Sequence, residues 1–455
     1  MAVLLFILLI VSEIGFAVFE ITKKNTKKEW TKKRLYADIV QAVSFILMIF
    51  LPGIDLSFRF KGLFFVLILR VLFAGISTLT HRKNIIEKKI SGIVISAFAS
   101  AVLFFVSMVP AFVFADYEGR TLTGEYEVGE RKAILVDGSR LETFETDGSH
   151  REVPVYFYYP EKYSGDLHSL PLVLFSHGAF GYYQSNTSTY MELASHGYVV
   201  VSLEHPYHSL FTNDSDGKLI TVDPEFFNTA LKIGSDEESG YSEEEIFEIT
   251  GKWMELRIAD MNFAIDSLKE AACGDYESFL FAYDDKEKID EIMRLVDTGK
   301  IGLMGHSLGG ATAVTVGRRE DISAVIDLDG TMLGEETSVE NGTPVINDAP
   351  YHTPLLCLTN EPHHNEALEA EKIAYSYANN VILNAADEGF ETYIKGSLHM
   401  NFTDLPLFSP FLSKRLGGMG TVDPGVCIDT VNSLVLNFFD CYLKGTGTFT
   451  VNESY

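Results

Sequence analysis

The chain has 455 residues, 47% of them hydrophobic and 22% charged, and a net charge of −27 at pH 7. At about 150 residues per domain this length predicts two to four folded units, and the composition excludes a disordered or collagen-like polymer. The negative charge argues against a nucleic-acid partner, because phosphate contacts need clustered lysine and arginine. Four cysteines are too few for a disulfide scaffold.

Charge is divided sharply between two parts of the chain. Residues 1–115 hold 14 lysines and arginines against 6 aspartates and glutamates, a net of +8. Of the chain's 36 basic and 63 acidic side chains, the remaining 22 and 57 give residues 116–455 a net of −35. We therefore expect two parts that face different environments.

The basic N-terminal part carries four apolar runs, each close to the ~20 residues with which a helix crosses a ~30 Å hydrocarbon core. They are residues 2–20, 36–56, 62–80 and 91–115. The first run is not typical of a signal peptide, because no lysine or arginine precedes it and Glu13 interrupts it. The sequence predicts a four-span transmembrane anchor over residues 1–115.

The loops between these runs differ in charge. Basic residues gather in the first and third loops: Lys23, Lys24, Lys27, Lys28, Lys32, Lys33 and Arg34, then Arg82, Lys83, Lys88 and Lys89. The second loop holds only Arg59 and Lys61. Because basic loops stay cytoplasmic, we expect an integral, multi-pass membrane protein whose residues 116–455 are extracytoplasmic.

Two ionisable residues stand inside the apolar runs, Glu13 in the first and Arg70 in the third. Counted from the outer ends of their runs at 1.5 Å per residue, their depths agree to within roughly 5 Å. Charged side chains inside a membrane are costly and usually paired. We predict an ion pair between Glu13 and Arg70 that holds the helices together, with a transport or sensing role as the alternative.

Residues 116–455 alternate between strand-like and helix-like segments. Two Asp-Gly turn signals between β-rich runs predict hairpin structure over 131–160. Nearly continuous apolar strands, typical of a parallel sheet covered on both faces, follow at 170–178, 197–206, 300–307, 323–330 and 353–362. The predicted fold class is α/β, a doubly wound, mostly parallel sheet that forms a catalytic domain over residues 116–455.

Two further segments of this domain have recognisable patterns. Apolar residues at helical spacing from Met254 to Leu268 follow a capping box made by Ser242 and Glu245. The acidic segment 209–250 is interpreted as an insertion, either a solvated surface loop or a lid over one edge of the sheet.

A candidate nucleophile stands in the segment Gly305-His306-Ser307-Leu308-Gly309. An apolar strand leads into this G-x-S-x-G pattern, and Ala- and Gly-rich sequence suited to a helix leaves it. This is the arrangement of a nucleophile elbow, whose strained turn lifts the serine hydroxyl above the sheet. We predict Ser307 as the nucleophile.

A nucleophilic serine needs a histidine base, which follows it in the chain order of such elbows. Downstream histidines are His352, His363, His364 and His399. His399 is favoured because it stands in a Gly/Ser-containing loop after a strand-like segment. The adjacent His363 and His364 are assigned to a solvated loop.

Three carboxylates compete for the role of the acid that orients the base. Asp329 ends the strand at 323–330, so it would emerge beside Ser307 at the carboxyl edge of the sheet. Glu361 ends the next strand, and Asp327 lies two residues before Asp329, deeper in its strand. We favour Asp329, with Glu361 and then Asp327 as alternatives.

The oxyanion hole should combine the N–H of Leu308 with that of Ala179, in the loop after the strand at 170–178. His177 and His306 flank these elements, and we expect them to pack or form hydrogen bonds rather than act in catalysis.

His205 and His208 have a spacing that metals use, yet no partner cluster is visible. We expect neither metal nor cofactor, and no disulfide between Cys427 and Cys441, which one helix would hold about 21 Å apart.

Taken in order, these motifs resemble the platelet-activating factor acetylhydrolase family of α/β-hydrolases, in its bacterial, membrane-attached form. The resemblance covers roughly residues 120–445 and rests on "GEYEVGERKAILVD", "LFSHGAFG", "GHSLGG", "DLDGTMLG" and "SLHMNFTD". It implies a triad of Ser307, Asp329 and His399, oxyanion donors at Leu308 and Ala179, and metal-free hydrolysis of short or oxidised sn-2 acyl chains of phospholipids. The acidic insertions and the N-terminal anchor depart from the family.

The sequence is therefore interpreted as a membrane-anchored serine ester hydrolase that acts through an acyl-enzyme. Its expected partners are an ester or phospholipid substrate and the lipid bilayer. The alternatives are a lipase, esterase or amidase of other specificity on the same fold, and a membrane sensor or transport component with a degenerate hydrolase domain.

Overall fold

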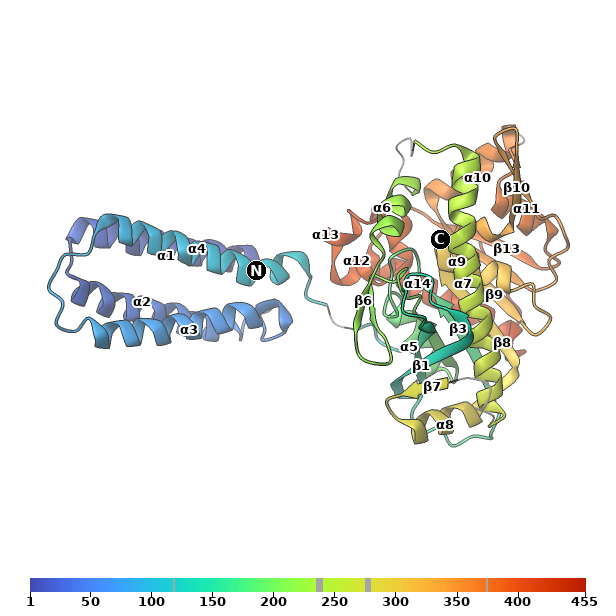
Figure 1. Cartoon of the computed structure of the whole chain (residues 1–455), viewed down its shortest axis with the longest axis horizontal. Helices are drawn as coiled ribbons and strands as arrows, with labels where there is room; N and C mark the ends of the chain where they lie inside the picture. Colours follow the sequence, from blue (N-terminus) through green and yellow to red (C-terminus); the bar gives the residue numbers. More distant parts are fainter. Residues whose placement is uncertain (118, 235–239, 275–279, 374) are drawn as a thin grey trace. The chain divides into compact units, whose positions relative to one another are not determined.

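The computed structural model describes residues 1–117, 119–234, 240–274, 280–373 and 375–455. The chain forms two compact units. Unit 1 consists of Met1–Glu118 with Phe408–Leu412, and unit 2 of Gly119–Leu407 with Ser413–Tyr455. Figure 1 labels the helices and strands of both units in chain order.

Unit 1 contains four long helices that run up and down beside one another (Figure 1). They are α1 (Ala2–Lys23), α2 (Lys27–Met48), α3 (Phe58–Thr80) and α4 (Ile90–Val113). α2 packs on α3, α3 on α4, and α4 on α1. Their shared core includes Phe45, Leu67 and Phe104, which are buried.

The expectation of four transmembrane runs needs a correction. Among the described residues, three helices are long and apolar enough to cross a membrane, namely α1, α3 and α4. α2 does not begin at residue 36 as expected, because Thr26 and Glu29 form a capping box that starts the helix at Lys27. The first half of α2 therefore contains basic residues that the sequence analysis assigned to a loop, from Lys27 to Arg34.

The predicted ion pair inside unit 1 is confirmed. Arg70 Nη2 lies 2.7 Å from Glu13 Oε1, and both side chains are nearly inaccessible. α2 adds two further charges, since Arg34 contacts Glu13 at 2.8 Å and Asp38 contacts Arg70 at 2.7 Å. Arg34 and Asp38 are thus buried in α2, and their charges are neutralised within the bundle.

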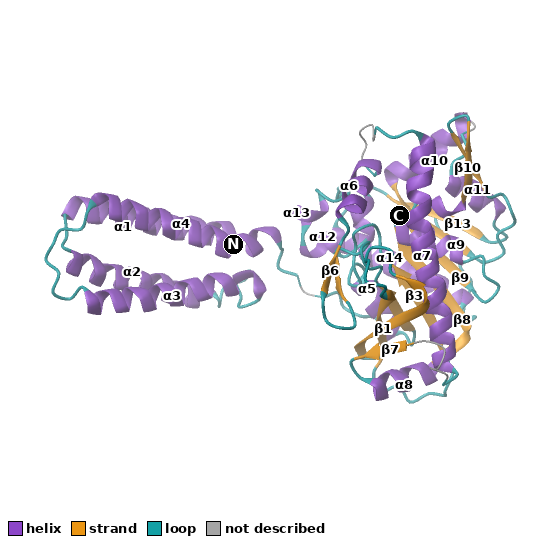
Figure 2. Ribbon diagram, in the orientation of Figure 1, coloured by secondary structure: helices purple, strands orange, loops and turns teal. Residues whose placement is uncertain are grey.

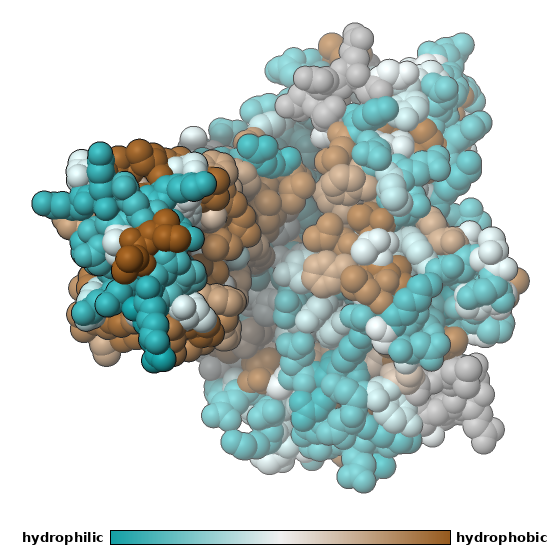
Figure 3. All heavy atoms as spheres, turned by 60° about the vertical axis from the view of Figure 1, so that its left-hand side comes forward, coloured by the Kyte–Doolittle hydropathy of each residue, from teal (hydrophilic) through white to brown (hydrophobic). Residues whose placement is uncertain are grey.

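The outer surface of unit 1 separates apolar from charged residues. In Figure 3, hydrophobic residues cover the sides of the bundle, and hydrophilic residues gather at the end formed by the α1–α2 and α3–α4 connections. These connections and the first turns of α2 carry the lysines and arginines of residues 23–34 and 82–89. One end of the bundle is therefore strongly basic.

Unit 2 is built on a nine-stranded sheet with the order β13-β12-β9-β8-β3-β4-β2-β1-β7. Neighbours from β4 to β13 are parallel, whereas β2, β1 and β7 pair antiparallel. The strands are β1 (Val128–Leu141), β2 (His150–Pro160), β3 (Leu170–Ser176), β4 (Val199–Leu203), β7 (Leu280–Tyr283), β8 (Val296–His306), β9 (Ala324–Leu328), β12 (Leu355–Asn360) and β13 (Gly389–Ile394). The predicted mixed α/β fold with a mostly parallel sheet is confirmed.

Helices cover both faces of this sheet, as the nearly continuous apolar strands require. One face packs against α7 (Glu243–Ala272), α8 (Lys286–Leu295), α9 (Leu308–Val316) and α11 (Ala378–Ala385). The other face packs against α5 (Thr187–Ser195) and α14 (Pro424–Tyr442). Figure 2 shows the strands as a central layer with α7 passing in front of them.

The hairpin predicted over 131–160 is formed by β1 and β2, but Asp137-Gly138 is not a turn, because β1 continues through it to Leu141 with a shift of register against β2. The expectation of a loop over 209–250 is wrong, since the segment forms the hairpin of β5 (Phe211–Asn213) and β6 (Leu219–Thr221), then α6 (Pro224–Ile233) and the start of α7. Its alternative role as a lid stays a prediction. Residues 235–239 of this segment lie outside the described residues.

Other local predictions hold. The capping box of Ser242 and Glu245 opens α7, and Cys427 and Cys441 both lie in α14 and are free thiols. The remaining elements are β10 (Glu336–Glu340), β11 (Thr343–Ile346), α10 (Glu361–Ile373), α12 (Leu405–Phe408), α13 (Pro410–Ser413) and two short 3-10 turns, Leu333–Glu335 and His399–Phe402.

Candidate active site

Ser307 occupies the sharp turn between β8 and α9. Its backbone has φ 57° and ψ −125°, which a side chain adopts only under strain. The neighbouring glycines permit this turn, because a Cβ on Gly305 would lie 2.2 Å from the backbone of Gly309, and one on Gly309 would lie 1.9 Å from the Ser176 carbonyl oxygen. β8, α9 and β3 thus meet more closely than other residues would allow.

Asp329 follows β9, the strand next to β8, and also has a positive φ, of 58°. Its buried carboxylate accepts hydrogen bonds from the backbone N–H and the side-chain amide of Asn360, each at 2.7 Å. Its two oxygens also face two histidine rings. His399 Nδ1 lies 2.6 Å from Oδ2, and His363 Nδ1 lies 2.9 Å from Oδ1.

His399 begins the 3-10 turn that follows β13. Its carbonyl oxygen lies 3.1 Å from His306 Nε2, and the two rings have centroids 4.5 Å apart. His306 thus ties the His399 loop to the elbow, which agrees with the packing role expected for it. In the described part of the chain, the hydrogen bonds of the His399 ring and carbonyl go to Asp329 and His306.

The two alternative acids lie apart from His399. Glu361 begins α10, and its Oε2 accepts the backbone N–H of Gly396 at 2.9 Å. Asp327 is buried beneath the elbow, where its Oδ1 accepts the N–H of Gly330 at 2.9 Å. Of the three candidates, Asp329 is the one whose carboxylate contacts the His399 ring.

His363 is a site residue that the sequence reading missed. The expected solvated loop is wrong, since His363 and His364 lie in the first turn of α10, and His364 contacts Glu391 at 3.0 Å. His363 stands three residues after the carboxyl end of β12, the strand beside β9, which brings its ring to Asp329. The sequence contains a signal for this contact, because neighbouring parallel strands end at the same edge of a sheet, and His363 and Asp329 each follow the end of such a strand.

The charges of this cluster perturb one another. Burial would raise the pKa of Asp329, but the charge and hydrogen bond of His363 and the hydrogen bond of His399 outweigh it and hold that pKa well below its usual range. Burial would lower the pKa of His363, but the Asp329 carboxylate raises it to about 9. At neutral pH, Asp329 is therefore an anion and His363 a cation.

Asp329, His363 and His399 also form a group whose ligand-type atoms lie within 4.8 Å of one another. The nitrogen–oxygen separations of 2.6 and 2.9 Å are those of charge-assisted hydrogen bonds. Two ligands on one zinc ion, at about 2.0 Å each in tetrahedral geometry, would stand roughly 3.3 Å apart. The geometry therefore fits a hydrogen-bonded cluster better than a metal site.

The two expected oxyanion donors lie on neighbouring elements. Leu308 is the first residue of α9, and Ala179 stands in the loop after β3; both belong to one apolar cluster. Phe226 of α6 and Trp253 of α7 belong to the same cluster, with ring centroids 5.0 Å apart. The 209–250 segment therefore packs beside Leu308 and Ala179 through Phe226.

Arg257 of α7 fixes the loop that follows β3. It is fully buried, and its Nη1 and Nη2 donate to the carbonyl oxygens of His177 and Gly178 at 2.6 and 3.2 Å. The sequence analysis missed this residue because it lies some 80 positions away from the loop. Arg257 therefore holds in place the loop that carries Ala179.

The other histidines near the loop are buried and held by hydrogen bonds and ring stacking. His177 Nε2 lies 2.8 Å from Ser209 Oγ, as the expected hydrogen-bonding role of His177 implies, and His205 lies between Ser176 and Asp260 at 2.9 and 3.0 Å. Burial lowers the pKa of His205 to about 4 and holds that of His208 well below its ordinary value. His208 stacks on Phe226, and its Nδ1 accepts from Arg257 Nε at 3.4 Å.

Comparisons with known proteins agree with this architecture. The family described as platelet-activating factor acetylhydrolase, isoform II, matches residues 125–451. The platelet-activating factor acetylhydrolase of Cavia porcellus is 24% identical to this chain over 305 residues, 62% of this chain. That of Gallus gallus is 25% identical to this chain over 291 residues, 60% of this chain. The matched regions span 61% and 62% of those relatives' own lengths.

A solved structure gives the fold independently. The ferulic acid esterase from Streptomyces cinnamoneus superposes with a TM-score of 0.52 at 21% identity, over 73% of this chain and 95% of that one. At this identity the likeness concerns the α/β-hydrolase fold alone. Since the family match takes in most of the chain, the protein belongs to the platelet-activating factor acetylhydrolase family, isoform II.

Proposed function

We propose that the chain is a carboxylic ester hydrolase whose nucleophile is Ser307, whose base is His399 and whose orienting acid is Asp329. The observation that carries the proposal is the 2.6 Å contact between His399 Nδ1 and Asp329, beside a serine in a strained strand–helix turn. A carboxylate on Nδ1 leaves Nε2 as the basic nitrogen, which is the tautomer that a serine nucleophile needs.

In the proposed reaction, His399 Nε2 takes the Ser307 proton while Oγ attacks the ester carbonyl carbon. The N–H groups of Leu308 and Ala179 stabilise the oxyanion, and the imidazolium then protonates the leaving alcohol. Water, deprotonated by the same histidine, attacks the acyl-enzyme and releases the carboxylic acid. The Ser307–His399 hydrogen bond forms in the substrate complex, as is common for catalytic contacts that are long in the free enzyme.

The proposed substrate is a phospholipid with a short sn-2 acyl chain. Two observations support this choice: the relatives are named platelet-activating factor acetylhydrolases, and unit 1 contains three helices apolar enough to enter a bilayer. An enzyme attached to the membrane would meet an amphiphilic ester at high local concentration. An esterase of other specificity on the same fold is the alternative.

We further propose that residues 1–115 anchor the catalytic domain 116–455 to the outer face of the cell membrane. The α1–α2 and α3–α4 connections are both basic and lie at one end of the bundle. If this end is cytoplasmic, α4 runs outward from it and delivers the following residues to the extracytoplasmic side.

Activity is tested on the full chain with p-nitrophenyl esters of graded acyl length and with phospholipids of graded sn-2 chain. We expect turnover that falls as the acyl chain lengthens and that is lost in Ser307→Ala. Substantial turnover in Ser307→Ala would contradict the nucleophile assignment. A preference for aryl or long-chain esters over short sn-2 phospholipids would contradict the substrate and favour the alternative.

A further inference from the structure

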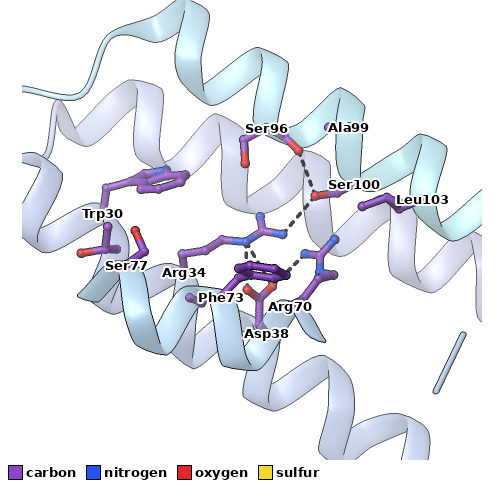
Figure 4. Close-up of a pocket in the computed structure, with 12 residues that line it drawn as sticks. Trp30, Arg34, Asp38, Arg70, Phe73, Ser77, Ser96, Ala99, Ser100 and Leu103 are labelled. Carbon is purple, nitrogen blue, oxygen red and sulfur yellow. Dashed lines mark hydrogen bonds and ion pairs between the residues drawn. The ribbon is translucent and has the colours of Figure 1, made fainter. Parts of the chain in front are cut away.

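Unit 1 contains a cavity of about 300 Å³ between α2, α3 and α4. Figure 4 shows Arg34, Asp38 and Arg70 side by side in it, with Trp30 and Ser77 towards one end and Ser100 and Leu103 across from them. The catalytic mechanism uses none of these residues. Ionisable groups within apolar helices are costly, and the cavity therefore calls for its own explanation.

The cavity holds hydrogen-bond donors without acceptors. The hydrogen bonds of Arg70 come from one nitrogen, Nη2, which donates to Glu13 and Asp38 at 2.7 Å each and to Gln41 Oε1 at 3.3 Å. Its Nε and Nη1 are buried and have no hydrogen-bond partner in the described part of the chain, although the Arg70 side chain is only 9% exposed and lies over the Phe104 ring at 4.5 Å. Trp30 Nε1 is likewise buried and without a hydrogen-bond acceptor there.

The neighbouring polar groups are already engaged. The three nitrogens of Arg34 donate to Glu13, Asp38 and Ser100, and the Ser100 hydroxyl donates to the Ser96 carbonyl oxygen. The cavity therefore lacks hydrogen-bond acceptors for the remaining donors of Arg70 and Trp30. Buried donors in an apolar setting are costly unless they are paired, so the fitting ligand is one that brings oxygen acceptors.

Charge at the cavity favours an anion over a neutral acceptor. Within the network, Glu13 and Asp38 balance Arg34 and Arg70. The additional charge comes from Lys88, whose Nζ lies 3.8 Å from the centre of the Trp30 ring. Trp30 thus has a cation on its face and a free N–H at its edge, at the basic end of the bundle.

The rim of the cavity is apolar. Phe73 and Leu103 both line it, and they are 67% and 48% exposed on the outer surface of the bundle. Phe73 lies on α3 and Leu103 on α4, and Figure 4 shows both beside the arginine pair. A small hydrophilic anion gains nothing from such a rim, whereas a lipid can place its head group among the donors and its acyl chains along Phe73 and Leu103.

We propose that this cavity binds the head group of an anionic phospholipid, with its phosphate oxygens accepting from Arg70 and Trp30. The inference rests on the proposal that unit 1 lies in a membrane, and it is independent of ester hydrolysis. It agrees with the basic end of the bundle, since anionic lipids are concentrated in the cytoplasmic leaflet where such ends lie.

The test is native mass spectrometry of the full chain in detergent, carried out in the Ser307→Ala background so that no lipid is consumed. The ligands are dioleoyl phosphatidylglycerol, dioleoyl phosphatidylcholine and inorganic phosphate. We expect phosphatidylglycerol to bind about tenfold more tightly than phosphatidylcholine, because both lipids carry the phosphate but only phosphatidylcholine adds a choline cation, which the basic end of the bundle repels. Equal binding of the two lipids, or phosphate binding as tight as phosphatidylglycerol, would overturn the proposal.

Variants locate the site. Trp30→Phe removes one donor and keeps the ring, Arg70→Lys keeps the charge that Glu13 and Asp38 need, and Ala99→Leu fills the cavity at an exposed position. Each should weaken phosphatidylglycerol binding by about tenfold.

The matched control is Trp253→Phe, the same change at the chain's second tryptophan, in unit 2. Wild-type binding in Trp30→Phe and Ala99→Leu, with melting temperatures unchanged, would refute the assignment.

Discussion

At the scale of single residues, Asp329 is the centre of the proposed site, because two histidines and one asparagine converge on its carboxylate. A shared acid of this kind does two things. It orients the His399 ring, and it fixes a second, charged imidazole nearby. The two effects are separable by substitution.

The first prediction concerns the identity of the acid. Asp329→Asn should lower kcat by on the order of 10⁴, since an amide no longer selects the right His399 tautomer. Glu361→Gln should lower kcat less than about tenfold, because Glu361 contacts the backbone of Gly396 and not the histidine. Circular dichroism and melting curves check that both variants fold. The opposite ranking would assign the role to Glu361.

The second prediction concerns His363. The cation on this ring lies beside Asp329 and its centroid is 6.0 Å from that of His399. His363 donates to the carboxylate that orients His399, so His363→Gln should lower kcat by about tenfold, because Asp329 loses one of the charge-assisted hydrogen bonds that hold it in place. His364→Gln is the matched control, since His364 contacts Glu391 instead. An unchanged kcat, or the same loss in both variants, would show that His363 does not support the acid.

The third prediction concerns stability. The pKa of His363 is raised from 6.5 to about 9 in the folded chain, so the folded state binds its proton more tightly than the unfolded one. The stabilisation is therefore complete below pH 6.5 and is lost as the pH rises through about 9. We expect the melting temperature to fall over this window, and the fall to be smaller in His363→Gln. Parallel curves for the two proteins would contradict this linkage.

At the scale of elements, the elbow depends on the close approach of α9 to β3. A Cβ on Gly309 would lie 1.9 Å from the carbonyl oxygen of Ser176, which is backbone and has little room to move. Gly251 offers a comparison within α7, since a Cβ there meets nothing within 4 Å. The same substitution therefore has opposite consequences at two helical glycines.

The fourth prediction follows from this contrast. Gly309→Ala should destabilise the chain by about 3 kcal/mol or more, the cost of overpacking a rigid contact, and should abolish activity. Gly251→Ala should stabilise it by about 0.5–1 kcal/mol through helix propensity. Thermal unfolding of both variants decides the matter. A small loss in Gly309→Ala would mean that α9 is able to shift without harm to the elbow.

At the scale of the whole molecule, the proposed topology rests on the basic α1–α2 and α3–α4 connections at one end of the helix bundle. Cys273 offers a direct probe, because it is exposed in unit 2, whereas Cys357 and Cys427 are buried. The partly exposed Cys441 is removed as Cys441→Ser. A membrane-impermeant maleimide then reports which side of the membrane unit 2 occupies.

The fifth prediction is that the maleimide labels Cys273 from outside intact cells. Replacing Lys23, Lys24, Lys27 and Lys28 by glutamine should reduce this labelling, because the basic end no longer holds the cytoplasmic side. Arg34 is left intact, since it belongs to the buried network. Labelling only after cell lysis would place unit 2 inside.

Much of the fold was predictable because its signals are local. The parallel strands could be recognised from short, nearly continuous apolar runs, and α7 from the capping box at Ser242. Errors arose where a local signal was ambiguous. Asp137-Gly138 reads as a turn but lies within β1, and the polar first half of α2 reads as a loop although Thr26 caps it as helix.

The sequence by itself determined the fold class, the capped start of α7 and the candidate residues Ser307, Asp329 and His399, since each depends on a short motif whose geometry is set by its neighbours in the chain. Only the tertiary structure decided which distant parts of the chain come into contact. His363, Arg257 and the Arg34–Asp38–Arg70 network carry no motif, and their contacts join elements 21 to 80 residues apart. Such contacts depend on strand order and helix packing, which the free energy of the whole chain selects and no local pattern records.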